Sequence, residues 1–186
     1  MNGRSVSSAA RPGLIGCYPG SFDPPTIGHL AVAEAALGHC GLERLDLVVS
    51  DEPLGKPEAS PVEVRVARLE AAVADLDRVA VVRTGLRLLA EICDGYDILV
   101  LGVDKWAQVL DPAWYGSEQA RDEAVAGLPD VVVAPRAGVP VPEGIDVLPV
   151  DPAVLAVSAS EIRAGRQAWA APAGRRAGTG ARPRGA

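Results

Sequence analysis

The sequence predicts an α/β fold of the Rossmann-like, doubly wound class: a mostly parallel sheet of five to six strands with helices on both faces. Short runs rich in Val, Leu and Ile recur along the chain, and segments with helical spacing of apolar residues separate most of them. The runs are apolar throughout, which fits strands buried on both faces of a parallel sheet. With 186 residues, the chain can form one domain with a single core.

Strands and helices are expected to alternate along the chain. The apolar runs predict strands at residues 14–19, 45–50, 79–83, 97–102 and 130–134, and a weaker run indicates a sixth at 145–150. Helical spacing predicts helices at residues 27–38, 62–76, 85–93, 117–127 and 158–166.

The two ends of the chain differ in composition from the predicted domain at residues 13–168. Residues 1–12 are small and polar and predict a disordered leader. Residues 169–186 are rich in Ala, Gly, Arg and Pro without periodicity and predict a disordered tail. Deleting nearly all of this tail is expected to leave stability and activity almost unchanged.

The charge distribution favours a small ligand over a nucleic acid. Residues 1–162 hold 24 acidic and 12 basic side chains, and six arginines but no acid follow Glu161. Because so acidic a body is a poor match for a phosphate backbone, we expect a small ligand held by a local positive site.

Composition also bears on location. No apolar run approaches the roughly 20 residues that span a bilayer, and the N-terminus lacks the apolar stretch of a secretory signal. Cys17, Cys40 and Cys93 show neither CxxC nor metal-ligand spacing and are expected to be reduced and buried. We therefore expect a soluble, cytoplasmic protein without membrane or nucleic-acid partners, and a homo-oligomer stays open.

The segment GSFDPPTIGH at residues 20–29, directly after the first expected strand, has the features of a phosphate-binding loop. Gly20 lets the backbone approach a ligand closely, and Thr26 stands where the N-cap of the next helix is expected. Gly28 and His29 fall in the first helical turn, where free N–H groups and the helix dipole favour an anion. By themselves, a Thr26 cap and a surface His29 would explain this pattern without any ligand.

A second polar segment, VSASEIR at residues 157–163, opens the last expected helix. Ser158 and Ser160 supply capping hydroxyls, and Arg163 supplies a forked cation near the same helix N-terminus. Together they form a candidate polyphosphate site, although such a helix start is also common as an ordinary cap.

Further candidates follow the second and fourth expected strands, at the edge where a doubly wound sheet binds ligands. After the fourth strand, Gly102 permits close approach, Asp104 could hold a ribose or order the loop, and Trp106 and Trp114 could stack on an aromatic ring or cover the core. The only two lysines also follow these strands; they are Lys56 and Lys105.

The first segment resembles the (H/T)xGH signature of the adenylyl- and cytidylyltransferase superfamily, with Thr at the first motif position, as in phosphopantetheine adenylyltransferases. The second resembles the (I/V)SSTxIR motif of the same superfamily, with Ala159 and Ser160 replacing Ser and Thr. The motifs occur in the expected order, about 130 residues apart. The resemblance covers residues 14–166. The residues matched to the first signature are Gly20, Ser21, Phe22, Asp23, Pro24, Thr26, Gly28 and His29.

This resemblance implies transfer of the adenylyl group of ATP to a phosphate-bearing acceptor, with Mg²⁺ carried by the triphosphate and no metal ligands from the protein. It implies catalytic roles for His29, Lys56 and Arg163. The implied ATP-binding residues are Gly20, Ser21, Phe22, Thr26, Gly28, His29, Ser158, Ser160 and Arg163. The implied acceptor-binding residues are Lys56, Gly102, Asp104, Lys105, Trp106 and Trp114.

The acceptor is less well defined than the reaction. The stretch from Gly102 to Trp106 is similar to the GxD…W stretch of nicotinate or nicotinamide mononucleotide adenylyltransferases, which favours a pyridine mononucleotide and NAD synthesis. Phosphopantetheine is the next choice, although residues 99–106 lack an Arg-Gly-x-Arg segment. Cytidylyl transfer is a third reading of the motifs, and a non-catalytic nucleotide-binding sensor also stays open.

Overall fold

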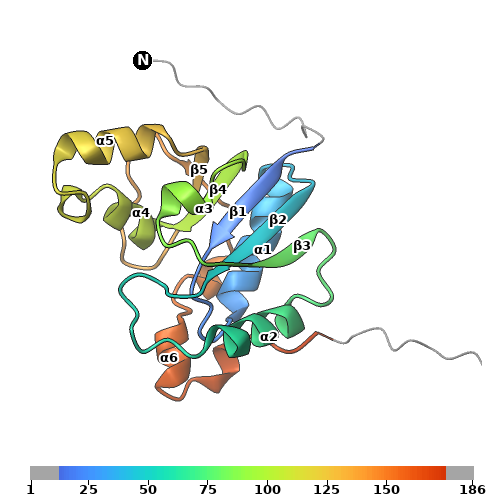
Figure 1. Ribbon diagram of the computed structural model, residues 1–186. Coiled ribbons are helices and arrows are strands. Elements are labelled where there is room, and N and C mark those ends of the chain that lie inside the picture. The colour runs from blue at the N-terminus through green and yellow to red at the C-terminus, as the bar shows by residue number, and fades with distance from the viewer. Residues whose placement is uncertain (1–12, 175–186) are drawn as a thin grey trace, which may run out of the picture.

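Six parallel strands form a sheet at the centre of the molecule in the computed structural model, which describes residues 13–174 (Figure 1). The order across the sheet is β3-β2-β1-β4-β5-β6, and every neighbouring pair is parallel. The predicted Rossmann-like class is therefore confirmed. The strands are β1 Ile15–Pro19, β2 Arg44–Ser50, β3 Val79–Thr84, β4 Ile98–Gly102, β5 Asp130–Ala134 and β6 Asp146–Val147.

Helices and short 3₁₀ turns connect the strands. The helices are α1 Ile27–His39, α2 Val62–Ala72, α3 Leu89–Ile92, α4 Val103–Val109, α5 Glu118–Ala126 and α6 Ala159–Arg163. The turns are η1 Pro112–Trp114, η2 Pro152–Val154 and η3 Gln167–Trp169. None of the helices in the described part of the chain has the length and apolarity needed to cross a membrane.

Alternate residues of the strands face two separate apolar clusters, one on each side of the sheet. Tyr18 and Val100 point into the cluster that α1 and α2 cover. Cys17 and Leu101 point into the other cluster, which includes residues of α3, α4 and α5. This two-face burial explains why the strands are apolar at consecutive positions.

Several regions differ from the expected elements. The helix expected at residues 85–93 is only α3, and the strand expected at residues 145–150 is only β6. Residues 103–109, expected to be a loop, form α4, since Val103, Trp106 and Val109 share a buried face at helical spacing. Residues 169–174, part of the expected tail, form backbone hydrogen bonds with Pro25 and Ala71 that apolar periodicity does not reveal. The expected leader at residues 1–12 and the remainder of the expected tail, residues 175–186, lie outside the described residues.

A buried arginine joins the loops that follow β1 and β2. Arg65 of α2 is only 1% exposed. Its guanidinium donates to the carbonyl oxygens of Ser60 at 2.8 Å, Ser50 at 2.9 Å, Asp51 at 3.0 Å and Ser21 at 3.3 Å. Each of these carbonyls would otherwise lose a partner where water is scarce.

Replacing this arginine should destabilise the protein. We expect Arg65→Met to lower the free energy of unfolding by about 2–4 kcal/mol, because buried carbonyl groups lose their donor. Urea denaturation measures the effect. The matched control, Arg68→Met, alters an exposed arginine of the same helix and should change stability by less than about 0.5 kcal/mol. Equal losses in the two variants would contradict this role.

Candidate active site

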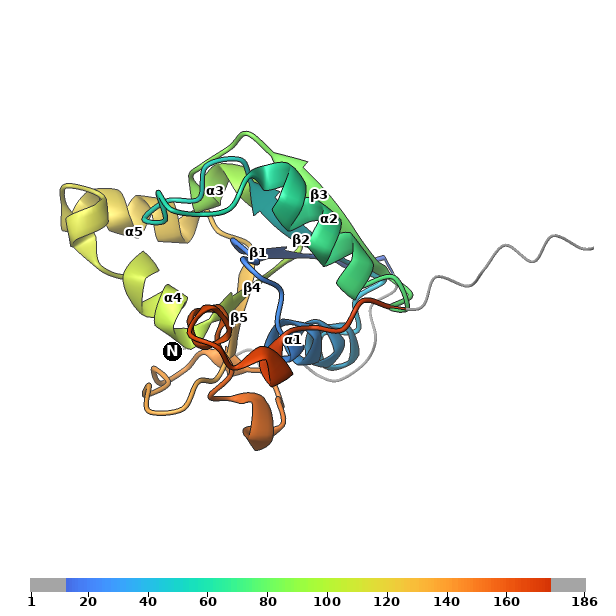
Figure 2. The same ribbon diagram turned by 90° about the horizontal axis from the view of Figure 1, so that it is seen from below.

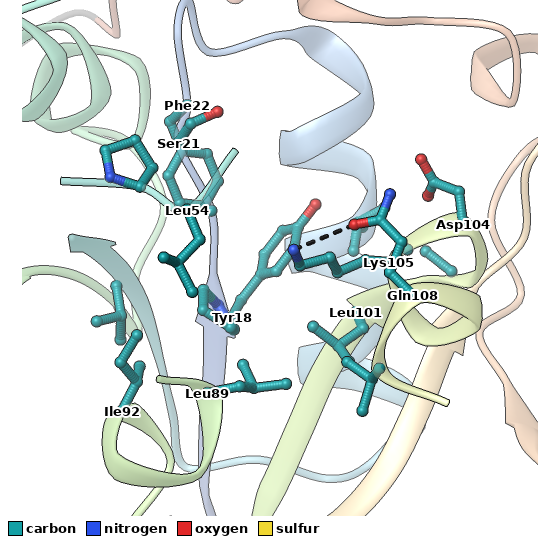
Figure 3. A pocket seen from close by; sticks show the side chains of 18 of the residues that line it. Tyr18, Ser21, Phe22, Leu54, Leu89, Ile92, Leu101, Asp104, Lys105 and Gln108 are labelled. Atoms are coloured by element: carbon teal, nitrogen blue, oxygen red, sulfur yellow. Dashed lines mark hydrogen bonds between the residues drawn. The ribbon is translucent and has the colours of Figure 1, made fainter. Parts of the chain in front are cut away.

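A cavity of about 870 Å³ opens at the carboxyl end of the sheet. Here the strand order reverses between β1 and β4, which is where ligands bind in doubly wound sheets. The lining combines residues from the loops after β1, β2, β4 and β5, and Figure 3 shows part of it. Of the predicted site residues, the cavity is lined by Gly20, Ser21, Phe22, Thr26, Gly28, His29, Lys56, Gly102, Asp104, Lys105 and Trp114.

Thr26 and His29 cap the start of α1 by bonding each other. The Thr26 hydroxyl accepts from the His29 backbone N–H at 3.1 Å, and the Thr26 backbone N–H donates to Nδ1 of His29 at 3.0 Å. Because Nδ1 accepts this bond, it carries no proton, and the neutral ring must hold its proton on Nε2. Nothing among the described residues accepts a hydrogen bond from Nε2. His29 therefore offers an N–H donor to the cavity.

The surroundings of His29 keep its ring neutral. Burial lowers the pKa of His29 to about 4, and the positive charges of Lys56 and Arg136 act in the same direction. Phe22 packs against the imidazole edge-on, with ring centroids 5.0 Å apart. At neutral pH the residue thus acts as an uncharged donor.

Cationic side chains from several segments line this cavity, among them Lys56 after β2, Lys105 in α4 and Arg136 after β5. Lys56, after β2, donates from Nζ to the Ser21 hydroxyl at 2.8 Å. Burial lowers the pKa of Lys56, and the charges of Arg163 and Lys105 act in the same direction. Arg136, after β5, pairs with Asp104 at 3.0 Å. Positive charge is thus concentrated at this cavity.

Arg136 and Tyr18 are two of the cavity residues that the sequence prediction missed. Arg136 follows β5, so the rule that selected residues after strands could have found it. Tyr18 lies within β1 and is one of the cavity-lining side chains labelled in Figure 3. Burial and the charge of Asp104 raise the pKa of Tyr18, so its hydroxyl stays protonated and can donate.

The VSASEIR segment packs behind the loop after β1. Ser158 is the N-cap of α6, and Arg163 donates to the carbonyl oxygen of Asp23 and to the Ser160 hydroxyl. None of these three predicted ATP-binding residues lines the main cavity. Arg163 instead lines a second cavity of about 490 Å³ together with residues 23–25.

The two motifs nevertheless meet at Gly28. A Cβ atom at Gly28 would lie 3.3 Å from Cβ of Val157, so a larger residue would press the segments apart. Glycine at this position therefore permits the first turn of α1 to lie against the start of the second motif.

The two tryptophans predicted to bind an acceptor have different surroundings. Trp106 is 8% exposed and packs into the core from the buried face of α4. It does not line the cavity. Trp114 in η1 is 62% exposed and lines the cavity. The structure therefore brings only Trp114 to the predicted ligand edge.

The cytidylyltransferase-like family model matches residues 17–165. The chain belongs to this family. The family resemblance predicted from the two motifs is thereby confirmed. Both motifs and all six strands fall within or at the edges of the matched region.

The similar proteins are named either phosphopantetheine adenylyltransferase or nicotinate-nucleotide adenylyltransferase. A phosphopantetheine adenylyltransferase of Clavibacter michiganensis is 34% identical over 163 residues, which are 81% of this chain and 98% of the relative. A probable nicotinate-nucleotide adenylyltransferase of Albidiferax ferrireducens is 31% identical over 66% of each chain. A phosphopantetheine adenylyltransferase of Dehalococcoides mccartyi is 44% identical, but the match spans only 41% of that relative and 37% of this chain.

A solved structure shares the fold. The Plasmodium falciparum nicotinic acid mononucleotide adenylyltransferase complexed with NaAD superposes with a TM-score of 0.61 at 14% identity. The match covers 81% of this chain and 82% of that one.

The lowered pKa of His29 makes stability depend on pH. Between about pH 6.5 and about pH 4 the unfolded chain binds a proton at His29 that the folded chain excludes. The stability that the neutral ring contributes is present above that window and is lost as the pH falls through it. From pH 7 to about pH 4.5, the free energy of unfolding should therefore fall more for the wild type than for His29→Gln. Parallel pH profiles from urea denaturation would contradict the neutral, capping histidine.

Proposed function

We propose that the protein is an adenylyltransferase that transfers AMP from ATP to a small phosphate-bearing acceptor and releases pyrophosphate. The observation that carries this proposal is the neutral His29, which has a free Nε2–H and lines, together with Lys56, the cavity at the reversal of strand order. A fixed N–H donor, a nearby cation and a helix N-terminus together suit a phosphate that gains negative charge.

The proposed reaction needs no general base. A phosphate monoester has a second pKa of about 6, so the acceptor oxygen is already anionic at neutral pH. It attacks the α-phosphorus of ATP in line, the new P–O bond forms, and the bond to the leaving pyrophosphate breaks. Catalysis then consists of positioning and charge stabilisation.

In this proposal His29 and Lys56 act on the phosphates directly, and Arg163 acts on them indirectly. The His29 Nε2–H donates to an α-phosphate oxygen, and Lys56 balances the charge that develops there. Arg163 acts through its charge, which is felt at Lys56, and through its bond to the Asp23 carbonyl. In this proposal Ser158 and Ser160 hold the start of α6, and with it Arg163.

Mg²⁺ is proposed to enter with ATP. Within residues 13–174, no group of three or more His, Cys, Asp or Glu side chains could hold a metal ion. Asp104 is the sole carboxylate among the described lining residues, and Arg136 already pairs with it. These residues fit a metal held by phosphate oxygens, where it would neutralise triphosphate charge. Because the reaction uses ATP, we assign it to the cytoplasm.

A pyridine mononucleotide, nicotinate or nicotinamide mononucleotide, is the first proposed acceptor. Trp114 at the cavity offers a ring face for stacking. The relative from Albidiferax is named for the nicotinate nucleotide.

Phosphopantetheine is the second proposed acceptor because one wall of the cavity is aliphatic. Figure 3 shows Leu89, Ile92 and Leu101 in the lower part of the cavity and Leu54 beside Tyr18. The uncharged arm of phosphopantetheine would bury apolar surface against these aliphatic side chains. The Clavibacter relative, matched over nearly its full length, carries this name. The aliphatic lining residues labelled there are Leu54, Leu89, Ile92 and Leu101.

Pyrophosphate release tests the proposed function. The purified chain is mixed with Mg²⁺, either ATP or CTP, and one acceptor at a time: nicotinate mononucleotide, nicotinamide mononucleotide or 4′-phosphopantetheine. We expect turnover with ATP and one of these acceptors. Nucleotide binding without pyrophosphate release from any pair would contradict an enzyme and favour a sensor.

With the productive pair, His29→Ala should lose about 10²- to 10³-fold in turnover, because one donor at the charged phosphate is gone. Circular dichroism and the melting temperature report whether the variant is folded. His39→Ala is the matched control, since the other histidine lies at the far end of α1, where it pairs with Asp146. Near-wild-type turnover of a folded His29→Ala variant would contradict the catalytic role.

A further inference from the structure

Residues 167–174, here called the C-terminal strap, cross the chain at the N-terminal end of α1. Ala170 forms an antiparallel bridge with Thr26, and the Ala171 N–H donates to the Pro25 carbonyl at 3.1 Å. Farther along, the Gly174 N–H donates to the Ala71 carbonyl of α2 at 2.6 Å. Figure 2 shows this segment running between α1 and α2.

The strap contacts the residues on which the His29 tautomer depends. Pro25 has no N–H, so its carbonyl is the one backbone group it can pair, and the strap pairs it. Thr26, the next residue, is bridged by the strap and also donates its N–H to Nδ1 of His29. A shift of Pro25 and Thr26 would move the Thr26 N–H away from the His29 imidazole.

The strap adds little to the apolar core. None of residues 167–174 is buried, and a cavity of about 490 Å³ separates part of the strap from α2. Its attachment consists mainly of backbone hydrogen bonds, with a contact between the Arg166 guanidinium and the Trp169 ring at 5.0 Å. Its loss should therefore disturb local geometry more than global stability.

We propose that the C-terminal strap is a positioning element of the active site, which holds Pro25 and Thr26 so that the Thr26 N–H keeps the His29 ring in its donor tautomer. The consequence for catalysis rests on the proposed adenylyl transfer. The effect on the Thr26 amide does not depend on it.

Three variants test whether the strap positions Thr26 locally or stabilises the whole fold. A chain that ends at Trp169 lacks the bridge and both hydrogen bonds, whereas a chain that ends at Gly174 keeps every contact described and is the control. Ala171→Pro removes only the N–H that bonds Pro25. The substitution is compatible with its neighbour, because Ala170 has φ −65° and ψ 138°, a conformation that residues before proline favour.

The first measurement is hydrogen exchange of the Thr26 amide, which requires no substrate. In the chain ending at Trp169 and in Ala171→Pro, this amide should exchange about tenfold faster, which corresponds to the loss of one hydrogen bond. Amides at the centre of β1 and β4 should keep their protection. Unchanged protection of Thr26 in both variants would overturn the proposal. So would loss of protection across the whole sheet, since the strap would then be a general stabiliser.

The second measurement is turnover with the productive substrate pair. Composition alone predicts that deleting residues 170–186 leaves activity almost unchanged, but the contacts of Ala171 and Gly174 change this expectation. In the two strap variants kcat should fall about tenfold with a smaller change in the KM for ATP, while the chain ending at Gly174 matches the full chain. A normal kcat in variants whose Thr26 amide is exposed would overturn the positioning role. If the full chain itself releases no pyrophosphate, the proposed function fails, and the exchange result still decides whether the strap holds Thr26.

Discussion

A reciprocal pair of hydrogen bonds between Thr26 and His29 is the constraint on which the rest of the site depends. The backbone bond to Nδ1 selects the tautomer, and burial beside positive charge keeps the ring unprotonated. Without this bond, the imidazole could turn or take up its proton on the wrong nitrogen. The same bonds begin α1, so the start of the helix and the orientation of the donor are one structural feature.

Other parts of the fold converge on the loop that contains this pair. Arg65 bonds the Ser21 carbonyl from inside, and Arg163 bonds the Asp23 carbonyl from the opposite side. The strap pairs the Pro25 carbonyl. Segments far apart in the sequence thus hold the backbone carbonyls of one short loop. Rigid positioning of this kind is what a reaction without a general base requires.

Much of this organisation could be predicted from local sequence. The apolar runs predict the sheet because strands buried on both faces have few other compositions. Thr26, His29 and Lys56 were predicted since helix caps and strand ends have definite chemical preferences, and the structure brings all three to one cavity. Trp106 shows the limit of such prediction. A tryptophan after a strand can belong to a ligand site or to the core, and Trp106 lies on the buried face of α4.

Long-range backbone pairing was beyond prediction from composition. Residues 169–174 lack apolar periodicity, yet the N–H groups of Ala171 and Gly174 bond to the loop before α1 and to α2. Arg65 likewise carried no signal, because an arginine on an amphipathic helix is normally exposed. Its burial depends on four carbonyls contributed by two loops, which the sequence of α2 cannot reveal.

The central claim is that His29 is a neutral imidazole protonated on Nε2, and ¹⁵N NMR of the ring measures this directly. The chain has only two histidines, so a His39→Ala sample assigns the signals. At pH 7, the account predicts one protonated nitrogen, Nε2, and one unprotonated nitrogen, Nδ1, with the Nε2 signal shifting when Mg²⁺ and ATP are added. A ring protonated on both nitrogens, or on Nδ1 alone, would contradict the account.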